Sequence, residues 1–232
     1  MGGSFQGFDI VFLAIVAGFV LYRLASVLGR RTGHERERTN PYAEAPKPVA
    51  PGKGEDKAEG TPAAPAPARP AESAIEAIAP KGSRLARALT ELQIADRNFN
   101  PDDFLAGART AYEMIVTAFA QGDRRTMKPL LSDDVFHGFD EAISARETRG
   151  ERVEMTFVGL RNAQIADVEL KDTQAEIDVR FVSETITCTK NADGAVIEGD
   201  PTSVHETRDL WTFSRNVKSS DPNWTLIATQ TS

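Results

Sequence analysis

Three side chains of this sequence could carry acid–base chemistry: Tyr112, His205 and Asp209. A phenol, an imidazole or a carboxylate works as a general acid or base only where burial or a charged neighbour shifts its pKa toward the working pH. No spacing in the sequence places these three groups together. We expect Asp209 to pair with Arg208 or Arg180, or to face water, and we predict no catalytic residue.

Few other residues could support metal, redox or nucleophilic chemistry. The chain has 3 histidines and 1 cysteine. His137, on a helix, and His205, on a strand, are expected at the surface. Cys188 lies in a Thr-Cys-Thr strand setting and is expected to be a small packing residue, because no base is placed to activate its thiol. The sequence contains no phosphate-binding glycine loop, GxSxG or HExxH motif, so neither a metal nor another cofactor is predicted.

The overall composition excludes two further classes of protein. The 232 residues include 27 Lys and Arg against 34 Asp and Glu, a net charge of −7, whereas general nucleic-acid binders are usually basic. One cysteine cannot form an intrachain disulfide framework, so a small disulfide-stapled secreted domain is not expected. Hydrophobic residues make up 41% of the chain, an ordinary fraction for a globular protein, but they are unevenly distributed.

The first part of the sequence, residues 1–31, is typical of a membrane anchor. Residues 8–28 are almost entirely apolar and would span about 31 Å as a helix at about 1.5 Å per residue. Its uncharged part is 10–22, and the basic residues Arg23, Arg30 and Arg31 all lie C-terminal to that part. The positive-inside rule then places the N-terminus outside and the remaining chain in the cytoplasm. The alternative is a buried helix of a soluble domain.

Residues 32–80 are predicted to be a disordered linker. The stretch 41–80 holds nine prolines and twelve alanines with scattered charges. Such a composition cannot bury enough apolar surface to offset the entropy lost on ordering, and its prolines favour an extended chain. The simplest function of this stretch is to hold a domain away from the membrane.

Residues 81–232 are predicted to form the folded domain, beginning with a run of helices. Leu85, Leu89 and Leu92 form one apolar stripe on a helix over 83–96. Its basic neighbours would suit a helix lying on a membrane surface, whereas a stripe that covers the core is the alternative. A second helix begins at Asn100 and ends at Gly122, and two shorter ones follow before residue 150.

After residue 150 the hydrophobic pattern changes to that of strands. Alternation is clearest over 175–181, where every second residue is apolar. The predicted strands cover 155–170, 175–189, 204–215 and 224–228. A loop at 191–201, with a turn at Asp193-Gly194, is expected to form a small hairpin excursion. Helices followed by consecutive antiparallel strands predict an α+β fold. We expect helices packed on one face of a curved four-stranded antiparallel sheet, leaving a concavity between the two layers.

Four stretches resemble one known family. They are FNPDDFLAGARTAYEMIVTAFAQGDRRTMKPLLSDDVFHGFDEAISARE (99–147), ELKDTQAEIDVRFVSETIT (169–187), VIEGDPTSVHETRDLWTFSR (196–215) and DPNWTLIAT (221–229). The chain is similar here to the Tim44-like domain, and more closely to its alphaproteobacterial, membrane-anchored TimA-type form. The resemblance implies a cystatin/NTF2-like domain with a large apolar pocket.

The same resemblance implies partners and a location. The mitochondrial relatives scaffold an Hsp70-type chaperone at a translocation channel and contact the inner membrane. By resemblance we expect membrane lipids, a translocon or an Hsp70-type chaperone as partners, no nucleic acid, and a single-pass protein of the bacterial inner membrane. This sequence carries an anchor and a Pro/Ala-rich linker where the mitochondrial relatives have a long charged helical segment.

Three hypotheses about function remain open from the sequence. The first is a membrane-anchored, non-enzymatic adaptor for protein translocation or membrane-protein handling. The second is a module that binds a lipid or another hydrophobic ligand, and the third, least favoured, is an enzyme. The expected pocket residues are Phe104, Tyr112, Val116, Phe157, Phe181 and Trp211. The expected membrane-proximal cations are Arg23, Arg30, Arg31, Lys81, Arg84 and Arg87.

Overall fold

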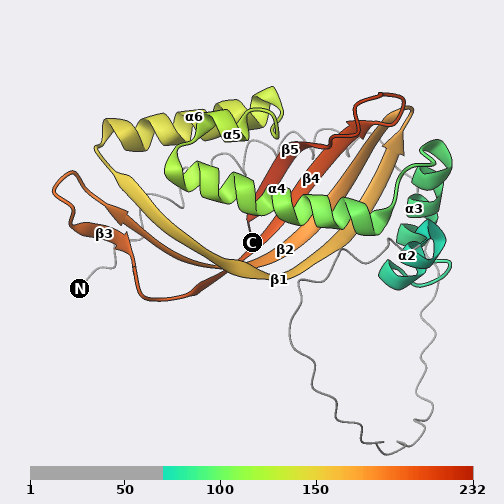
Figure 1. Cartoon of the computed structure of the whole chain (residues 1–232), viewed down its shortest axis with the longest axis horizontal. Helices are drawn as coiled ribbons and strands as arrows, with labels where there is room; N and C mark the ends of the chain where they lie inside the picture. The colour runs from blue at the N-terminus through green and yellow to red at the C-terminus, as the bar shows by residue number, and fades with distance from the viewer. Residues whose placement is uncertain (1–69, 232) are drawn as a thin grey trace, which may run out of the picture.

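The computed structural model describes residues 70–231, which fold as helices followed by an antiparallel sheet. The predicted α+β arrangement is thereby confirmed (Figure 1). Within these residues, no helix is both long and apolar enough to cross a membrane. The predicted span 8–28, its three arginines and most of the predicted linker lie outside the described residues.

Helix α2, Ala71–Ile78, corrects the predicted end of the linker. It lies inside the range 32–80, and Ala74 and Ile75 are buried against the rest of the domain. The folded part therefore begins at α2 and not at residue 81. The averaged Pro/Ala composition hides this helix, because its short apolar repeat directly follows a proline-rich stretch.

Helix α3, Arg84–Ala95, begins where the sequence predicts, since the Ser83 hydroxyl accepts a hydrogen bond from the Ala86 backbone N–H. Leu89 and Leu92 are fully buried in the core. The apolar stripe of α3 therefore covers the domain, and it does not provide a membrane-binding face.

Helix α4, Pro101–Gln121, is the longest helix of residues 70–231. Asn100 caps its first turn, and Gly122 ends it in a left-handed conformation with φ 72°, a conformation that glycine adopts without steric cost. The short helix α5, Arg124–Met127, follows after an Asp123 cap. Helix α6, Asp133–Thr148, is capped by Ser132.

The sheet has five strands, where the sequence predicts four. Strands β1 (Arg152–Lys171), β2 (Gln174–Lys190), β4 (His205–Asn216) and β5 (Thr225–Thr231) pair antiparallel in the order β1-β2-β4-β5. The additional strand β3, Val196–Gly199, lies in the predicted looped excursion and pairs with β2. The small hairpin excursion expected there is confirmed, but it was not counted as a strand of the sheet because its four exposed residues show no burial pattern.

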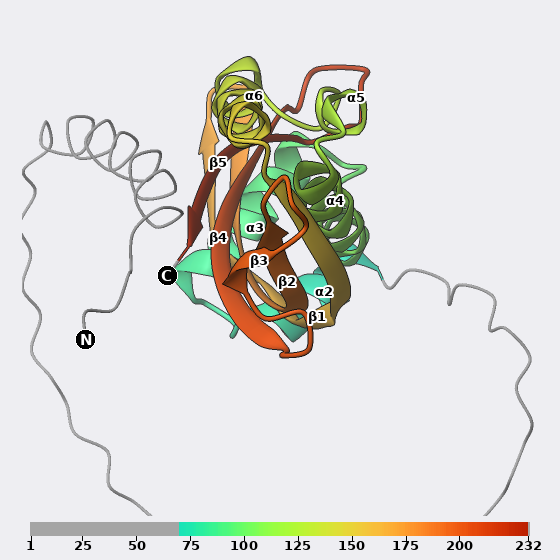
Figure 2. The same ribbon diagram turned by 90° about the vertical axis from the view of Figure 1, so that its left-hand side faces the viewer.

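The sheet is curved and α4 lies across its concave face, while α6 covers one end (Figures 1 and 2). Strand β1 has three register shifts against β2, and such bulges bend a strand. Alternate residues of β2 face α4: Ala175, Ile177, Val179 and Phe181 are fully buried, as the alternation in the sequence predicts. Tyr112 packs against this row, with its ring centroid 4.5 Å from that of Phe181.

Candidate functional site

A pocket lies toward each end of α4, between the helix and the sheet. The first, here called the α4–α6 pocket, has a volume of about 440 Å³. Its aliphatic and phenylalanine side chains come from both helices and from the edge strand β1: Ile115, Val116, Phe119, Phe139, Val153 and Met155. Strands β2, β4 and β5 supply a series of hydroxyl groups: Ser183, Thr185, Thr187, Thr207, Thr229 and Thr231. The pocket therefore combines apolar side chains with a set of hydroxyl groups.

Tyr112 and Asp209 form a buried hydrogen-bonded pair in this pocket. The Tyr112 hydroxyl donates to Asp209 Oδ2 at 2.5 Å, and the Thr231 hydroxyl donates to Asp209 Oδ1 at 2.5 Å. Because the Tyr112 proton is directed at Asp209, the Ser183 hydroxyl, 2.9 Å away, is left to donate to the Tyr112 oxygen. Asp209 is only 7% exposed. The expectation that it pairs with Arg208 or Arg180, or faces water, is wrong.

Burial governs the protonation of this pair. It raises the pKa of the Asp209 carboxyl, an effect that the hydrogen bonds from Thr231 and Tyr112 partly oppose. Burial, together with the nearby Asp209 carboxylate, also raises the pKa of Tyr112 well above its usual value. Tyr112 therefore stays protonated at neutral pH. The pair is a structural hydrogen-bond network in which each side chain holds the other in place.

The raised pKa of Asp209 makes a prediction about stability and pH. In the window between the ordinary aspartate pKa of about 3.9 and the higher pKa of folded Asp209, the folded chain binds the proton and the unfolded chain has lost it. The free energy of unfolding should therefore fall as pH rises through this window. Asp209→Asn keeps an acceptor for Tyr112 and Thr231 and should lose this pH dependence, as measured by urea unfolding from pH 4 to pH 8.

Asp200 offers a control, because its pKa is shifted in the opposite direction to that of Asp209. Hydrogen bonds from Thr202 and Ser203 lower its pKa to about 2, so its contribution is lost as pH falls toward that value. Asp200→Asn should leave the slope between pH 4 and pH 8 unchanged. If Asp209→Asn has the same pH profile as the wild type, the buried carboxyl is not the titrating group.

Arg146 is a buried cation at the wall of the α4–α6 pocket, and sequence reasoning missed it. It is 5% exposed, and its Nη2 donates to the backbone carbonyls of Phe119 at 2.5 Å and Ala120 at 2.8 Å. Its guanidinium also lies 5.3 Å from the Phe119 ring centroid. A cation at these carbonyls stabilises the C-terminal end of α4. The spacing of Arg146 in the sequence could have indicated its burial, because Arg146 continues the apolar stripe formed by Phe139 and Ile143.

Arg146→Ala should lower the free energy of unfolding by about 1.5–3 kcal/mol, the range for hydrogen bonds to a charged group. The substitution leaves the last carbonyls of α4 without their donor. Arg149→Ala is the matched control at the end of α6, the helix that carries Arg146, since the Arg149 side chain is 51% exposed and pairs of solvent-exposed residues contribute about 0–1 kcal/mol. Equal losses for the two variants, measured by urea unfolding, would contradict the capping role of Arg146.

The predicted pocket residues do not share one site. Tyr112, Val116 and Trp211 line the α4–α6 pocket. Phe181 belongs to the core below it, and Phe157 packs against Tyr112 with 6.3 Å between ring centroids. Phe104 lines the second pocket, at the other end of α4.

This second pocket, here called the aromatic pocket, has a volume of about 370 Å³. Its aromatic residues are Phe99, Phe104, Phe213 and Trp224. It borders a buried ion pair between Arg215 and Asp96, which joins β4 to the end of α3. The sequence does not predict this pair, because its two residues lie far apart in the chain and neither breaks the hydrophobic periodicity of its own element.

The predicted membrane-proximal cations of the described residues are partly engaged within the domain. Lys81 pairs with Glu76 at 2.9 Å, and Arg84 pairs with Asp167. Arg87 borders a groove between α2 and α3. Since two of the three already have carboxylate partners, they form no concentrated basic patch.

A long helix laid across a curved antiparallel sheet, with a pocket at each end, makes this a small α+β domain with two candidate binding pockets. Comparison with known proteins identifies it further. The chain belongs to the Tim44-like domain family, whose model matches residues 85–231. Tim44-like domains are generally non-catalytic.

The related curated proteins are distant. A mitochondrial import inner membrane translocase subunit of Arabidopsis thaliana is 20% identical over 125 residues, which is 54% of this chain and 26% of that protein. A probable translocase subunit of Caenorhabditis elegans is 22% identical over 153 residues, covering 62% and 35%. The Mus musculus subunit is 22% identical over 148 residues, covering 62% and 33%. The chain thus spans between a quarter and about a third of these relatives.

Solved structures show a weaker likeness. The intermembrane space region of the chloroplast protein ARC6 is 10% identical, with a TM-score of 0.38, and the match covers 55% of this chain and 95% of that one. A conserved protein from Planctomyces limnophilus has a TM-score of 0.31 at 16% identity, covering 56% and 98%.

Proposed function

We propose that this chain is a membrane-anchored, non-enzymatic adaptor that presents its Tim44-like domain at the cytoplasmic face of the bacterial inner membrane. Membership of the family carries the proposal, together with the apolar run over 8–28 and the prolines that follow it. The N-terminus lies outside, the chain crosses once, and the proline-rich stretch sets how far the domain stands from the bilayer. The role is in protein translocation or membrane-protein handling.

The expected partners are a translocon subunit or an Hsp70-type chaperone. This part of the proposal is supported by the curated relatives, whose names describe subunits of a translocase. The Tyr112–Asp209 pair is consistent with a non-enzymatic role, because both carboxylate oxygens already accept hydrogen bonds from the protein.

Site-specific photocrosslinking in native membranes tests the adaptor role. Tyr112 and Trp211 are buried, so the probes belong at exposed apolar positions on different elements: Ile94 on α3, Met114 on α4, Val158 on β1 and Ile197 on β3. An adaptor should give discrete protein adducts from one of these surfaces, with the other three as controls. Adducts to lipid alone, or to other copies of the chain alone, would contradict the proposal.

A second candidate function is the binding of a lipid or another amphiphile in the α4–α6 pocket. The observation that favours it is the lining of this pocket, which combines apolar side chains from α4, α6 and β1 with hydroxyl groups from β2, β4 and β5. A volume of about 440 Å³ falls within the range for small-molecule sites. An acyl chain would contact the apolar side chains, and its polar end would bind the hydroxyls.

Native mass spectrometry of the full chain, purified gently with added phospholipid, tests this candidate. Val116→Trp should fill the pocket and abolish lipid adducts, because Val116 lines it. Met114→Trp is the matched control, since Met114 lies on the same helix but is 42% exposed and outside the pocket. Equal lipid binding by the two variants would exclude the pocket as the site.

A further inference from the structure

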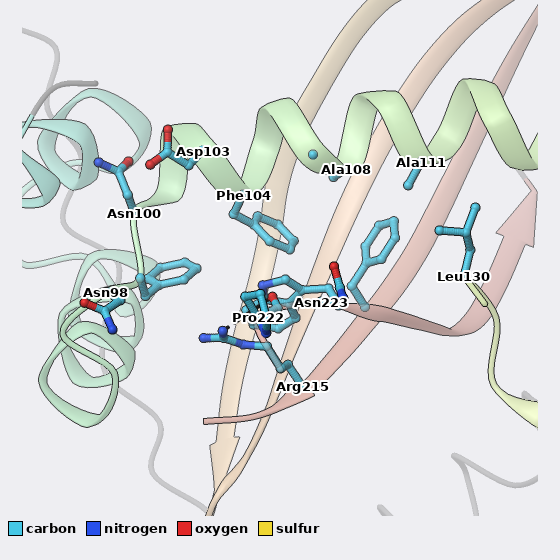
Figure 3. A pocket seen from close by; sticks show the side chains of 14 residues that line it. Asn98, Asn100, Asp103, Phe104, Ala108, Ala111, Leu130, Arg215, Pro222 and Asn223 are labelled. Atoms are coloured by element: carbon cyan, nitrogen blue, oxygen red, sulfur yellow. Dashed lines mark hydrogen bonds between the residues drawn. The ribbon is translucent and has the colours of Figure 1, made fainter. Parts of the chain in front are cut away.

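The aromatic pocket is formed where the start of α4 faces the turn between β4 and β5 (Figure 3). Phe104 and Trp224 meet edge to face with their centroids 4.9 Å apart, and the Phe99 ring lies 6.1 Å from that of Trp224. On the α4 side the lining continues with Gly107, Ala108 and Ala111. These small residues leave room between the helix and the turn, so the pocket is open beside its rings.

The rim of this pocket is polar. Asn98, Asn100 and Asn223 contribute side-chain amides, and Asp103 contributes an exposed carboxylate. Figure 3 shows Asn98, Asn100 and Asp103 around one side of the rings and Pro222 and Asn223 on the other. A ligand that fits must therefore offer rigid apolar groups to the rings, carbonyl groups to the amides and a positive charge near Asp103.

An extended proline-rich segment has this chemistry. Proline rings pack against aromatic side chains, the backbone carbonyls of such a segment are not used internally, and its fixed φ lowers the entropy lost on binding. This sequence contains such a segment with positive charges: residues 46–53, PKPVAPGK, where Lys47 and Lys53 flank Pro48 and Pro51. We propose that the aromatic pocket binds this segment of the same chain.

The position of the pocket makes an intramolecular contact feasible. Helix α2 packs against both α3 and α4, and it lies at the same end of the domain as the start of α4 (Figure 1). About 20 residues separate Pro51 from α2, and a proline-rich chain reaches about 3 Å per residue. A tethered segment also has a high effective concentration at a nearby site, so a modest affinity is enough for occupancy.

Occupancy has a consequence beyond the adaptor role, and this consequence rests on the proposed membrane anchor. A segment held in the pocket removes the residues between it and the domain from the tether, so that only the stretch between the apolar run and residue 46 separates the domain from the anchor. Its release would let the domain stand further from the anchor. The pocket therefore regulates the reach of the domain, and a competing proline-rich peptide would lengthen it.

The test uses ¹⁹F NMR of the full chain, purified in mild detergent with both tryptophans replaced by 5-fluorotryptophan. Trp224 reports on the aromatic pocket, and Trp211, which lines the α4–α6 pocket, is an internal control. Replacing Pro48 and Pro51 with alanine should shift the Trp224 resonance and leave that of Trp211 unchanged. Adding a synthetic peptide of residues 45–53 to this variant should restore the original shift.

A matched pair of substitutions makes the test specific to the segment. Pro62 and Pro65 have the same spacing without lysine neighbours, and replacing them with alanine should leave both resonances in place. The proposal is overturned if the Trp224 resonance is the same in the wild type and the Pro48/Pro51 variant, or if only the Pro62/Pro65 variant shifts it. A wild-type shift that changes on dilution would assign the occupant to a second copy and also overturn it.

Discussion

Replacing Phe181 with alanine is expected to lower the free energy of unfolding of this domain by about 3–5 kcal/mol, the cost of truncating a fully buried aromatic side chain. Phe181 has no exposed surface. Its ring lies 4.5 Å from Tyr112, 5.7 Å from Trp211 and 6.5 Å from Phe213, centroid to centroid. The cavity left by alanine would open between α4 and the centre of the sheet, where backbone elements on both sides prevent collapse.

The measurement is urea unfolding of the full chain, followed by the fluorescence of its 2 tryptophans. Val158→Ala on β1 is the control, because Val158 is 49% exposed and surface truncations usually change stability by less than about 0.5 kcal/mol. A midpoint that falls without a change in the denaturant slope identifies a loss of stability alone. A loss below about 1 kcal/mol for Phe181→Ala would mean that the aromatic cluster re-forms without it.

Two further substitutions separate the contribution of packing to stability from that of hydrogen bonding. Phe181→Leu keeps much of the apolar volume and should cost clearly less than alanine, whereas Tyr112→Phe keeps the ring and removes the hydroxyl that donates to Asp209. The second change leaves a buried carboxyl short of one donor, which costs about 1–3 kcal/mol. The two losses should be coupled, because the Tyr112 and Phe181 rings are in contact.

Sequence patterns predicted the elements of this fold where a local physical rule decides the outcome. Asn100 and Gly122 mark the ends of α4 by capping and by a left-handed conformation, and the alternation over 175–181 places one row of β2 in the core. Helix α2 was missed, and strand β3 was expected as a small hairpin but not counted in the sheet, because neither has a long pattern. Helix α2 has only eight residues and follows a proline-rich stretch, and β3 has only four residues, all exposed. Segments this short show little hydrophobic periodicity.

The site was less predictable, because its polar contacts join residues far apart in the chain. Asp209 has arginines nearby in sequence and across the strand register, yet it faces the concave side of the sheet and meets Tyr112 on α4. Which face a strand residue occupies follows from the pattern, but which helix residue lies opposite depends on how the helix crosses the sheet. The prediction of the apolar pocket residues was partly right for the same reason. The local pattern determines that a side chain faces inward, but the packing of helix on sheet determines which of these side chains share a pocket.

The buried ion pair between Asp96 and Arg215 leads to the other large expected effect. Their side chains are 10% and 12% exposed, and the Arg215 guanidinium also lies 5.0 Å from the Trp224 ring centroid. Asp96→Ala should cost about 3–5 kcal/mol, because it leaves a charge buried without its partner. The loss should be larger than for an ordinary surface pair, since Arg215 Nε already lacks a hydrogen-bond partner among the described residues.

A comparison of Asp96→Ala with a double variant distinguishes the cost of an orphaned charge from the net value of the pair. Asp96→Leu with Arg215→Met removes both charges and keeps apolar volume, and we expect it to recover most of the stability lost by Asp96→Ala, since such replacements are often neutral or stabilising. The Asp96 carboxylate also accepts the Asn98 backbone N–H at 3.1 Å, so about 1 kcal/mol should stay lost. If the double variant is as unstable as Asp96→Ala, the loss comes from the missing ion pair and not from an unpaired charge. The ion pair itself would then hold α3 on the sheet.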